Sequence, residues 1–175
     1  MSAMANLCSI CPAECCKTYF ITVTSFDVLR ICEGTGKKAG EFAVLHEPRL
    51  LGFDPDLVLE TTDGYGRYLL GIRSHPCVFL KNNRCAVHAF APLSCRRYPF
   101  TLAGTFNGRF CPLLPGIALR LNGPDITRGL MEGELGSYKA IVKEWNERRK
   151  NAKRKEGCVR FLLDRTKRAV RLKSS

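Results

Sequence analysis

The hydrophobic pattern of the chain changes near Leu130, and the two parts predict different elements. After Leu130, apolar residues recur at spacings of three and four, which predicts an amphipathic helix with one apolar face. Gly157 interrupts this region, and a second, basic helix is expected to begin near Val159. The apolar face of the first helix consists of Leu135, Tyr138, Ile141, Val142 and Trp145.

The part before Leu130 alternates between short strand-like and helix-like patches. Residues 18–23 are rich in β-branched and aromatic side chains and predict a strand. Thr24 and Asp27 have the spacing of a capping box, which predicts a helix that ends near Gly34. A second short helix is expected over residues 42–46, before Pro48.

Turn residues divide the middle of the chain. Glycine and asparagine at 63–66 and 81–84 predict two turns, and residues 68–72 and 78–80 are expected to pair as an antiparallel hairpin. The resulting fold class is α+β, with a small antiparallel sheet, cysteine-bearing loops, short flanking helices and a long basic C-terminal helical region. We predict a domain over residues 1–136 and a helical extension over residues 137–175.

The net charge also differs between the C-terminal helical region and the rest of the chain. The chain has 175 residues and a net charge of +12, of which +10 falls in residues 138–175. Clustered Lys and Arg could bind nucleic acid or an acidic partner through counterion release. No aromatic residue interleaves the basic run at 148–155 to stack on bases, so a solvated helical face is the favoured interpretation.

Ten cysteines are the most informative feature of the composition. No run approaches the roughly 20 apolar residues of a membrane span, and the first residues do not resemble a signal peptide, so we expect a cytoplasmic protein. Thiols stay reduced in the cytoplasm, and clustered thiols there more often hold metal than form disulfides. The first group holds Cys8, Cys11, Cys15 and Cys16, and the second holds Cys77, Cys85, Cys95 and Cys111.

The order of these motifs resembles a known family, the cysteine-cluster proteins of the CxxCxxCC or YkgJ type, described as zinc- or iron-chelating domains. The resemblance covers about residues 8–116. Three residues separate Cys11 from Cys15, where the family pattern has two. The residues that carry the resemblance are the opening cysteine run, residues 21–27, residues 77–80, residues 85–88, residues 92–100 and the Cys111-Pro112 pair.

The resemblance implies metal binding by the eight cysteines of the two groups. Thiolate is a soft ligand that suits zinc, copper(I) and iron-sulfur clusters. We favour an iron-sulfur cluster of the 4Fe–4S type, with zinc as the alternative, because structural zinc sites tend to have shorter paired spacings. Arg96 and Arg97 are expected to bring positive charge to the cofactor. Cys32, Cys158, His46 and His75 are interpreted as structural, and His88 is a candidate ligand for which a structural role is favoured.

The reaction is less defined than the site. An iron-sulfur protein with a redox or modification-assisting role is the first hypothesis, acting on an unknown electron-transfer or substrate protein. A zinc-stabilised binding module whose tail contacts nucleic acid or an acidic partner is the alternative. Flagellin lysine N-methylases share the cysteine pattern, but the chain shows no methyl-donor motif. No catalytic residue is predicted, and a Cys8–Cys11 thiol oxidoreductase is disfavoured because no βαβ pattern surrounds the pair.

Overall fold

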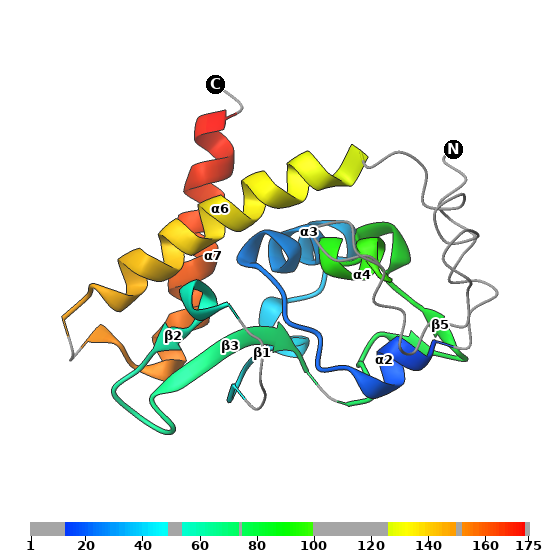
Figure 1. The fold of residues 1–175 in the computed structure, drawn as a ribbon, viewed down its shortest axis with the longest axis horizontal. Coiled ribbons are helices and arrows are strands. Elements are labelled where there is room, and N and C mark those ends of the chain that lie inside the picture. Colours follow the sequence, from blue (N-terminus) through cyan, green and yellow to red (C-terminus); the bar gives the residue numbers. More distant parts are fainter. Residues whose placement is uncertain (1–12, 49–53, 74, 100–125, 150–151, 174–175) are drawn as a thin grey trace.

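A computed structural model describes residues 13–48, 54–73, 75–99, 126–149 and 152–173. Within these ranges, helices cover one side of a small sheet, and α2, α4 and β5 lie together at the end of the molecule away from α7 (Figure 1). The fold class is α+β, as predicted. In chain order the elements are α2 (Glu14–Thr18), α3 (Ser25–Thr35), η2 (Ala39–Glu41), β1 (Ala43–His46), η3 (Pro55–Leu57), β2 (Leu59–Glu60), β3 (Arg67–Ile72), β4 (Leu80–Lys81), β5 (Arg84–Cys85), η4 (His88–Phe90), α4 (Leu93–Arg97), α6 (Ile126–Asn146) and α7 (Lys155–Lys173).

The main sheet is antiparallel with the strand order β1-β3-β2. Ala43 of β1 pairs with Ile72, and Leu59 of β2 pairs with Tyr68, so β3 is the central strand. Five of the six β3 residues are buried, as expected for a strand paired on both sides. The second sheet is the β4-β5 hairpin, whose turn residues Asn82 and Asn83 adopt positive φ angles of 48° and 57°.

The capping box predicted at Thr24 is confirmed and explains where α3 begins. The Thr24 hydroxyl accepts a hydrogen bond from the Asp27 N–H, and the Asp27 carboxylate accepts one from the Thr24 N–H. The helix ends where Gly36 adopts the left-handed conformation with φ of 71°. Thr24 and Asp27 therefore satisfy backbone donors that an unsupported first turn would leave free.

Three predicted elements before residue 80 are wrong. Instead of a strand over residues 18–23, the chain forms only an isolated bridge between Thr22 and Gly71. Residues 43–46 form strand β1 rather than a helix, because their side chains alternate between buried and half-buried against β3. Residues 68–72 pair with β1 and β2, whereas Leu80 pairs with Cys85 in the separate hairpin.

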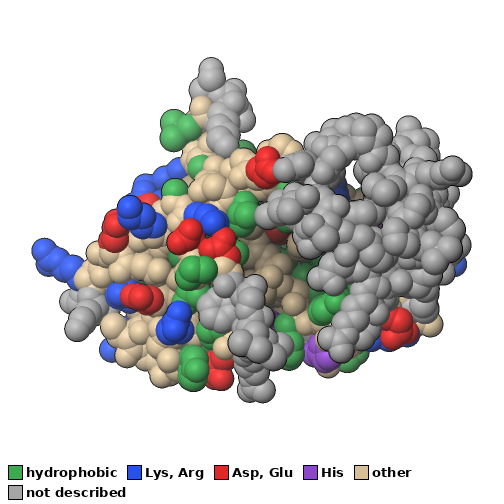
Figure 2. All heavy atoms as spheres, in the orientation of Figure 1, with side chains coloured by type: hydrophobic (Ala, Val, Ile, Leu, Met, Phe, Trp, Pro, Cys, Tyr) green, Lys and Arg blue, Asp and Glu red, His purple; other side chains and the backbone are tan. Residues whose placement is uncertain are grey.

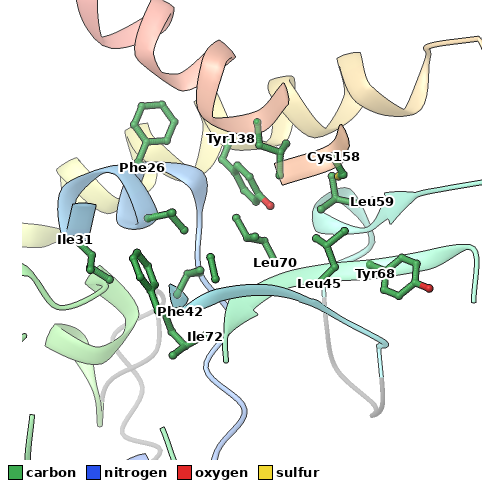
Figure 3. Close-up of a cluster of buried hydrophobic side chains, with 14 of the residues drawn as sticks. Phe26, Ile31, Phe42, Leu45, Leu59, Tyr68, Leu70, Ile72, Tyr138 and Cys158 are labelled. Carbon is green, nitrogen blue, oxygen red and sulfur yellow. The ribbon is translucent and has the colours of Figure 1, made fainter. Parts of the chain in front are cut away.

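The hydrophobic core lies between the main sheet, α3 and the two C-terminal helices (Figure 3). Both C-terminal helices are confirmed, but α7 begins at Lys155 and includes Gly157, so the predicted interruption at Gly157 is wrong. The apolar face of α6 is buried at Tyr138, Ile141, Val142 and Trp145. Cys158 and Leu162 of α7 have no exposed surface and join the same cluster as Leu59 and Leu70. The boundary predicted between residues 136 and 137 falls within α6, and it stays a prediction.

The end of α6 also covers the edge strand β2. The Trp145 indole donates to the Glu60 carbonyl at 2.7 Å, and the Asn146 amide side chain bonds to the Glu60 N–H and the Val58 carbonyl. Lys153, only 9% exposed, then reaches the Glu60 carboxylate and the Asn146 carbonyl. These side chains satisfy backbone groups that an edge strand otherwise leaves open.

Basic side chains of the C-terminal region take part in contacts within the fold. Arg165 pairs with Glu144, Lys139 pairs with Asp54 at 2.6 Å, and Arg148 lies over the Phe161 ring at 4.8 Å. Figure 2 shows Lys and Arg intermixed with Asp and Glu on the part of this face formed by α6 and α7. Contact between this region and nucleic acid stays a prediction. Among the described helices, none is both long and apolar enough to cross a membrane.

Candidate metal centre

Helix α2 presents two adjacent cysteines to one cavity. On an extended backbone, neighbouring side chains would point in opposite directions. Because Glu14–Thr18 is helical, Cys15 and Cys16 instead both line the cavity, with their sulfur atoms 4.0 Å apart. From the sequence alone, Cys15 and Cys16 could have faced separate sites, whereas the structure places both thiols at one cavity.

The second cysteine group meets the first through a backbone hydrogen bond. The Cys77 N–H donates to the Cys16 carbonyl at 2.9 Å, which joins two segments 61 positions apart in the chain. The side chain of Cys77 is 9% exposed and lines the same cavity. Residues 21–23 hold α2 against the sheet, because the Ile72 N–H donates to the Ile21 carbonyl and the Val23 N–H to the Leu70 carbonyl.

Cys85 and Cys95 reach the cavity from two further elements, β5 and α4. Cys85 lies opposite Leu80 in the β4-β5 hairpin, so the asparagine turn determines its position. Cys95 lies in α4, whose first N–H, from Leu93, donates to the Asp27 carboxylate at 3.0 Å. Asp27, the third residue of α3 and a member of its capping box, thus also holds the helix that carries Cys95.

These five cysteines line one cavity of about 190 Å³. The rest of its wall is largely aromatic and apolar, and Tyr19 contacts Tyr98 edge-to-face with ring centroids 5.8 Å apart. The described residues contain no three Cys, His, Asp or Glu side chains placed to hold one metal ion together. The thiols surround a space, and they come from α2, the turn at Cys77, β5 and α4.

The cavity makes it costly for several of these thiols to ionise together. Burial raises the pKa of Cys77, Cys85 and Cys95, and a thiolate at Cys15 raises all three further. A hydrogen bond with Cys16 lowers the pKa of Cys15 to about 7, whereas the same bond and burial raise the pKa of Cys16. A bound cation would offset both the desolvation and the mutual repulsion of the thiolates.

Backbone N–H groups offer hydrogen-bond donors to the sulfur atoms of Cys77 and Cys85. The N–H groups of Phe79 and Val87 lower the pKa of Cys77 and Cys85 respectively, against the larger effect of burial. Arg96 lines the cavity and donates to the Ala89 carbonyl, and its buried Nε has no hydrogen-bond partner among the described residues. Burial lowers the pKa of Arg96, and its charged neighbours are Arg30, Asp27 and Glu134.

Some of the predicted site residues line the cavity, and the others lie outside the described part of the chain. Cys15, Cys16, Cys77, Cys85, Cys95 and Arg96 all line the cavity. Cys8, Cys11, Cys111 and the side chain of Arg97 lie outside the described residues. The two cysteines left out of the ligand set lie elsewhere, with Cys32 half-buried on α3 and Cys158 buried in the core. The ligand set as a whole stays a prediction.

Three residues at or beside the cavity were missed or interpreted as structural. His88 lines the wall, and burial lowers its pKa, which favours the neutral form that can ligate a metal. Tyr19 faces Tyr98 across the wall, and nothing in its local sequence distinguishes it from a strand residue. Asp27 was recognised only as a cap, since its bond to Leu93 joins residues 66 positions apart.

Residues 7–112 match the sequence pattern of the CxxCxxCC family, whose description is "putative zinc- or iron-chelating domain". The chain belongs to the CxxCxxCC family. No curated protein and no solved structure matches the chain. The family match spans both cysteine groups and ends just after Cys111, so it includes every element that contributes a wall to the thiol cavity.

Membership in the CxxCxxCC family and the chemistry of the wall agree on metal binding. The donor atoms gathered in the cavity are thiol sulfurs, which prefer zinc, copper(I) and iron-sulfur clusters over magnesium or calcium. The donor type therefore fits a zinc or iron group, while no three of the described side chains are placed around a single ion. We treat this cavity as the candidate metal centre of the protein.

Proposed function

We propose that the protein carries an iron-sulfur cluster on cysteine thiolates of the candidate metal centre and uses it in a redox or modification-assisting role. The observation that carries the proposal is the convergence of five thiols from four separate segments on one cavity. Such gathering is costly without a cation, because burial and mutual repulsion oppose ionisation of the thiols.

The size of the site supports a cluster over a single zinc ion. Structural zinc takes four ligands about the ion, whereas five cysteines line this cavity and three more of the family pattern lie outside the described residues. The cavity volume of about 190 Å³ is more than ten times the roughly 10–15 Å³ that one water requires. A cluster of several atoms would fill this space more completely than a single zinc ion.

Residues of the cavity wall would set the reduction potential of such a cluster. When bound, a cluster of this type supplies one-electron transfer. The Phe79, Leu80 and Val87 N–H groups act on the Cys77 and Cys85 sulfurs, and hydrogen bonds to sulfur raise the reduction potential by stabilising the reduced, more negative form. Arg96 lies on the same wall and carries a positive charge.

Metal and sulfide analysis tests the proposal directly. Full-length protein purified without oxygen from cells supplied with iron should be coloured and should contain iron and acid-labile sulfide in similar amounts. Reduction should produce or change an electron paramagnetic resonance signal. Colourless protein with stoichiometric zinc and no sulfide would instead support the zinc-stabilised binding module.

Single cysteine variants test where the metal binds, whichever metal it is. Cys77→Ser, Cys85→Ser and Cys95→Ser should each lower the metal content per folded molecule by at least half, because each removes a thiolate from the cavity wall. Cys32→Ser is the matched control, since Cys32 is also half-buried but does not line the cavity. Equal metal loss in Cys32→Ser and Cys85→Ser would contradict the location, whichever metal is present.

A further inference from the structure

The charge of the segment that carries the second cysteine group is one-sided. Residues 64–124 contain eight Lys and Arg and no Asp or Glu, although the whole chain has 16 acidic residues. Residues 1–137 together carry a net charge of only +2, because residues 1–63 contribute −4 and residues 125–137 contribute −2. The near neutrality of this part of the chain therefore conceals a strongly basic segment around the candidate metal centre.

Lys81 and Arg84 place two of these cations opposite each other on the β4-β5 hairpin. They are direct partners in its antiparallel register, and both side chains are exposed. Side chains directly opposite each other have Cβ atoms about 4.5–5.5 Å apart, so like charges there repel and destabilise the hairpin. Neither side chain forms an ion pair with another described residue. The fold thus holds two like charges together at its surface without a counter-charge.

The asparagine turn positions this cation pair beside the candidate metal centre. Asn82 and Asn83 adopt the positive φ angles of a tight hairpin turn, 48° and 57°. Successive residues of a strand point to opposite faces, so Cys85 faces the cavity whereas Arg84, one peptide bond away, faces solvent. A molecule bound to Lys81 and Arg84 would therefore contact the hairpin that carries a cavity thiol.

The cation pair does not serve the candidate metal centre from within. Unlike Arg96, Lys81 and Arg84 are not among the described residues that line the cavity. The acidic side chain of the neighbouring helix α2, Glu14, pairs with Lys17 at 2.9 Å. Residues 1–12 and 100–124 contain no acidic side chain. Carboxylates that neutralise the cation pair are therefore best supplied by another molecule.

The small number of cations on the hairpin favours a protein partner over nucleic acid. Proteins that bind DNA commonly make about 6–10 phosphate contacts, whereas the hairpin offers two exposed cations. Two apolar side chains beside the cavity are also exposed, Phe20 by 51% and Val78 by 39%. Phe20 lines the cavity, and Val78 follows Cys77 directly. Transient electron-transfer interfaces are small, and protein interfaces commonly combine an apolar centre with a polar rim.

We propose that the exposed face of the β4-β5 hairpin docks an acidic protein surface and so brings a partner to the candidate metal centre. Carboxylates of the partner pair with Lys81 and Arg84 and relieve their mutual repulsion. Opposite charge also speeds the encounter at low salt. What the partner exchanges with the centre rests on the proposed function, but its binding does not, because binding is measurable on protein that holds either zinc or a cluster.

Matched charge reversals test the location of the docking surface. A fluorescently labelled polyglutamate peptide is the acidic probe, and anisotropy at low salt measures its affinity for full-length, metal-loaded protein. Lys81→Glu combined with Arg84→Glu should weaken binding by at least about fivefold. Lys167→Glu combined with Arg160→Glu is the control, because both residues are exposed on α7, away from β5 (Figure 1), and the net charge changes equally. The control pair should change the affinity by less than about twofold.

Lys81→Glu alone separates loss of docking from loss of the fold. It places opposite charges across the hairpin, so the melting temperature should rise while the affinity for the peptide falls. Metal and sulfide content should stay unchanged, so the result can be interpreted even if the protein holds zinc. Equal loss of affinity in the two double variants, unchanged affinity in Lys81→Glu, or tighter hairpin-dependent binding of a single-stranded oligonucleotide of equal charge would each overturn the proposal.

Discussion

Gly71 shows how one residue connects the sheet to the candidate metal centre. It is the second-to-last residue of β3, where the backbone at residues 21–23 approaches closely. A Cβ atom at this position would lie 2.5 Å from the His46 ring and 2.9 Å from the Ile21 carbonyl oxygen. Only glycine lets the chain that follows α2 lie this close to the strand.

Gly71→Ala is therefore expected to lower the free energy of unfolding by about 1–3 kcal/mol, the range for overpacking a buried site. Chemical denaturation of the metal-loaded protein measures this change. Gly40→Ala is the control, because Gly40 is exposed and a Cβ there meets nothing within 4 Å. The close approach at Gly71 would be ruled out as a constraint if both variants changed stability equally.

At the scale of elements, α6 and α3 use glycine differently. Gly133 and Gly136 lie in the interior of α6 with open space where a Cβ would project, so they add flexibility without a packing role. Gly34 in the last turn of α3 lies against Phe90, whose ring would be 2.2 Å from a Cβ atom. The same residue type is thus dispensable in one helix and required in the other.

Gly136→Ala should raise the free energy of unfolding by about 0.5–1 kcal/mol, because alanine loses less backbone entropy in a helix. Gly34→Ala should lower it, since the Phe90 ring must move. Thermal unfolding of the two variants side by side gives the comparison. A loss of stability in Gly136→Ala would mean that the exposed side of α6 is covered in solution.

Strand β1 illustrates an element that local sequence could not define. Residues 42–46 are a short apolar run, and such a run fits a buried helix segment as well as a strand. The choice depends on β3, whose residues pair with Ala43–His46 from 23 to 29 positions later in the chain. The α3 capping box, by contrast, was predicted correctly because all its contacts lie within four residues.

For the whole molecule, the C-terminal helices contribute directly to the core. Tyr138, Val142, Trp145, Cys158 and Leu162 are each at most 2% exposed and belong to one hydrophobic cluster with residues of α3 and the sheet. Arg30 also joins α3 to α6 through a two-bond contact with Glu134. Removal of these helices would expose the apolar side of the remaining core.

Truncation after residue 136 is expected to abolish cooperative folding. Loss of a single large core side chain costs about 3–5 kcal/mol, and the total stability of a domain is about 5–15 kcal/mol. Near-ultraviolet circular dichroism and thermal unfolding of residues 1–136 measure the outcome. A cooperative transition in this fragment would support the predicted division into a domain and an extension, and its absence would place both parts in one folding unit.

The sequence alone determined the features that depend on residue type and short spacing. These are the soft thiol donors, the family, the α3 cap, the asparagine turn and the apolar face of α6. Tertiary structure decided which distant groups meet. It joined Cys77 to Cys16 and used Asp27 to hold α4. The reason is physical: caps and turns are satisfied locally, whereas cavities are enclosed by side chains that only the packed core brings together.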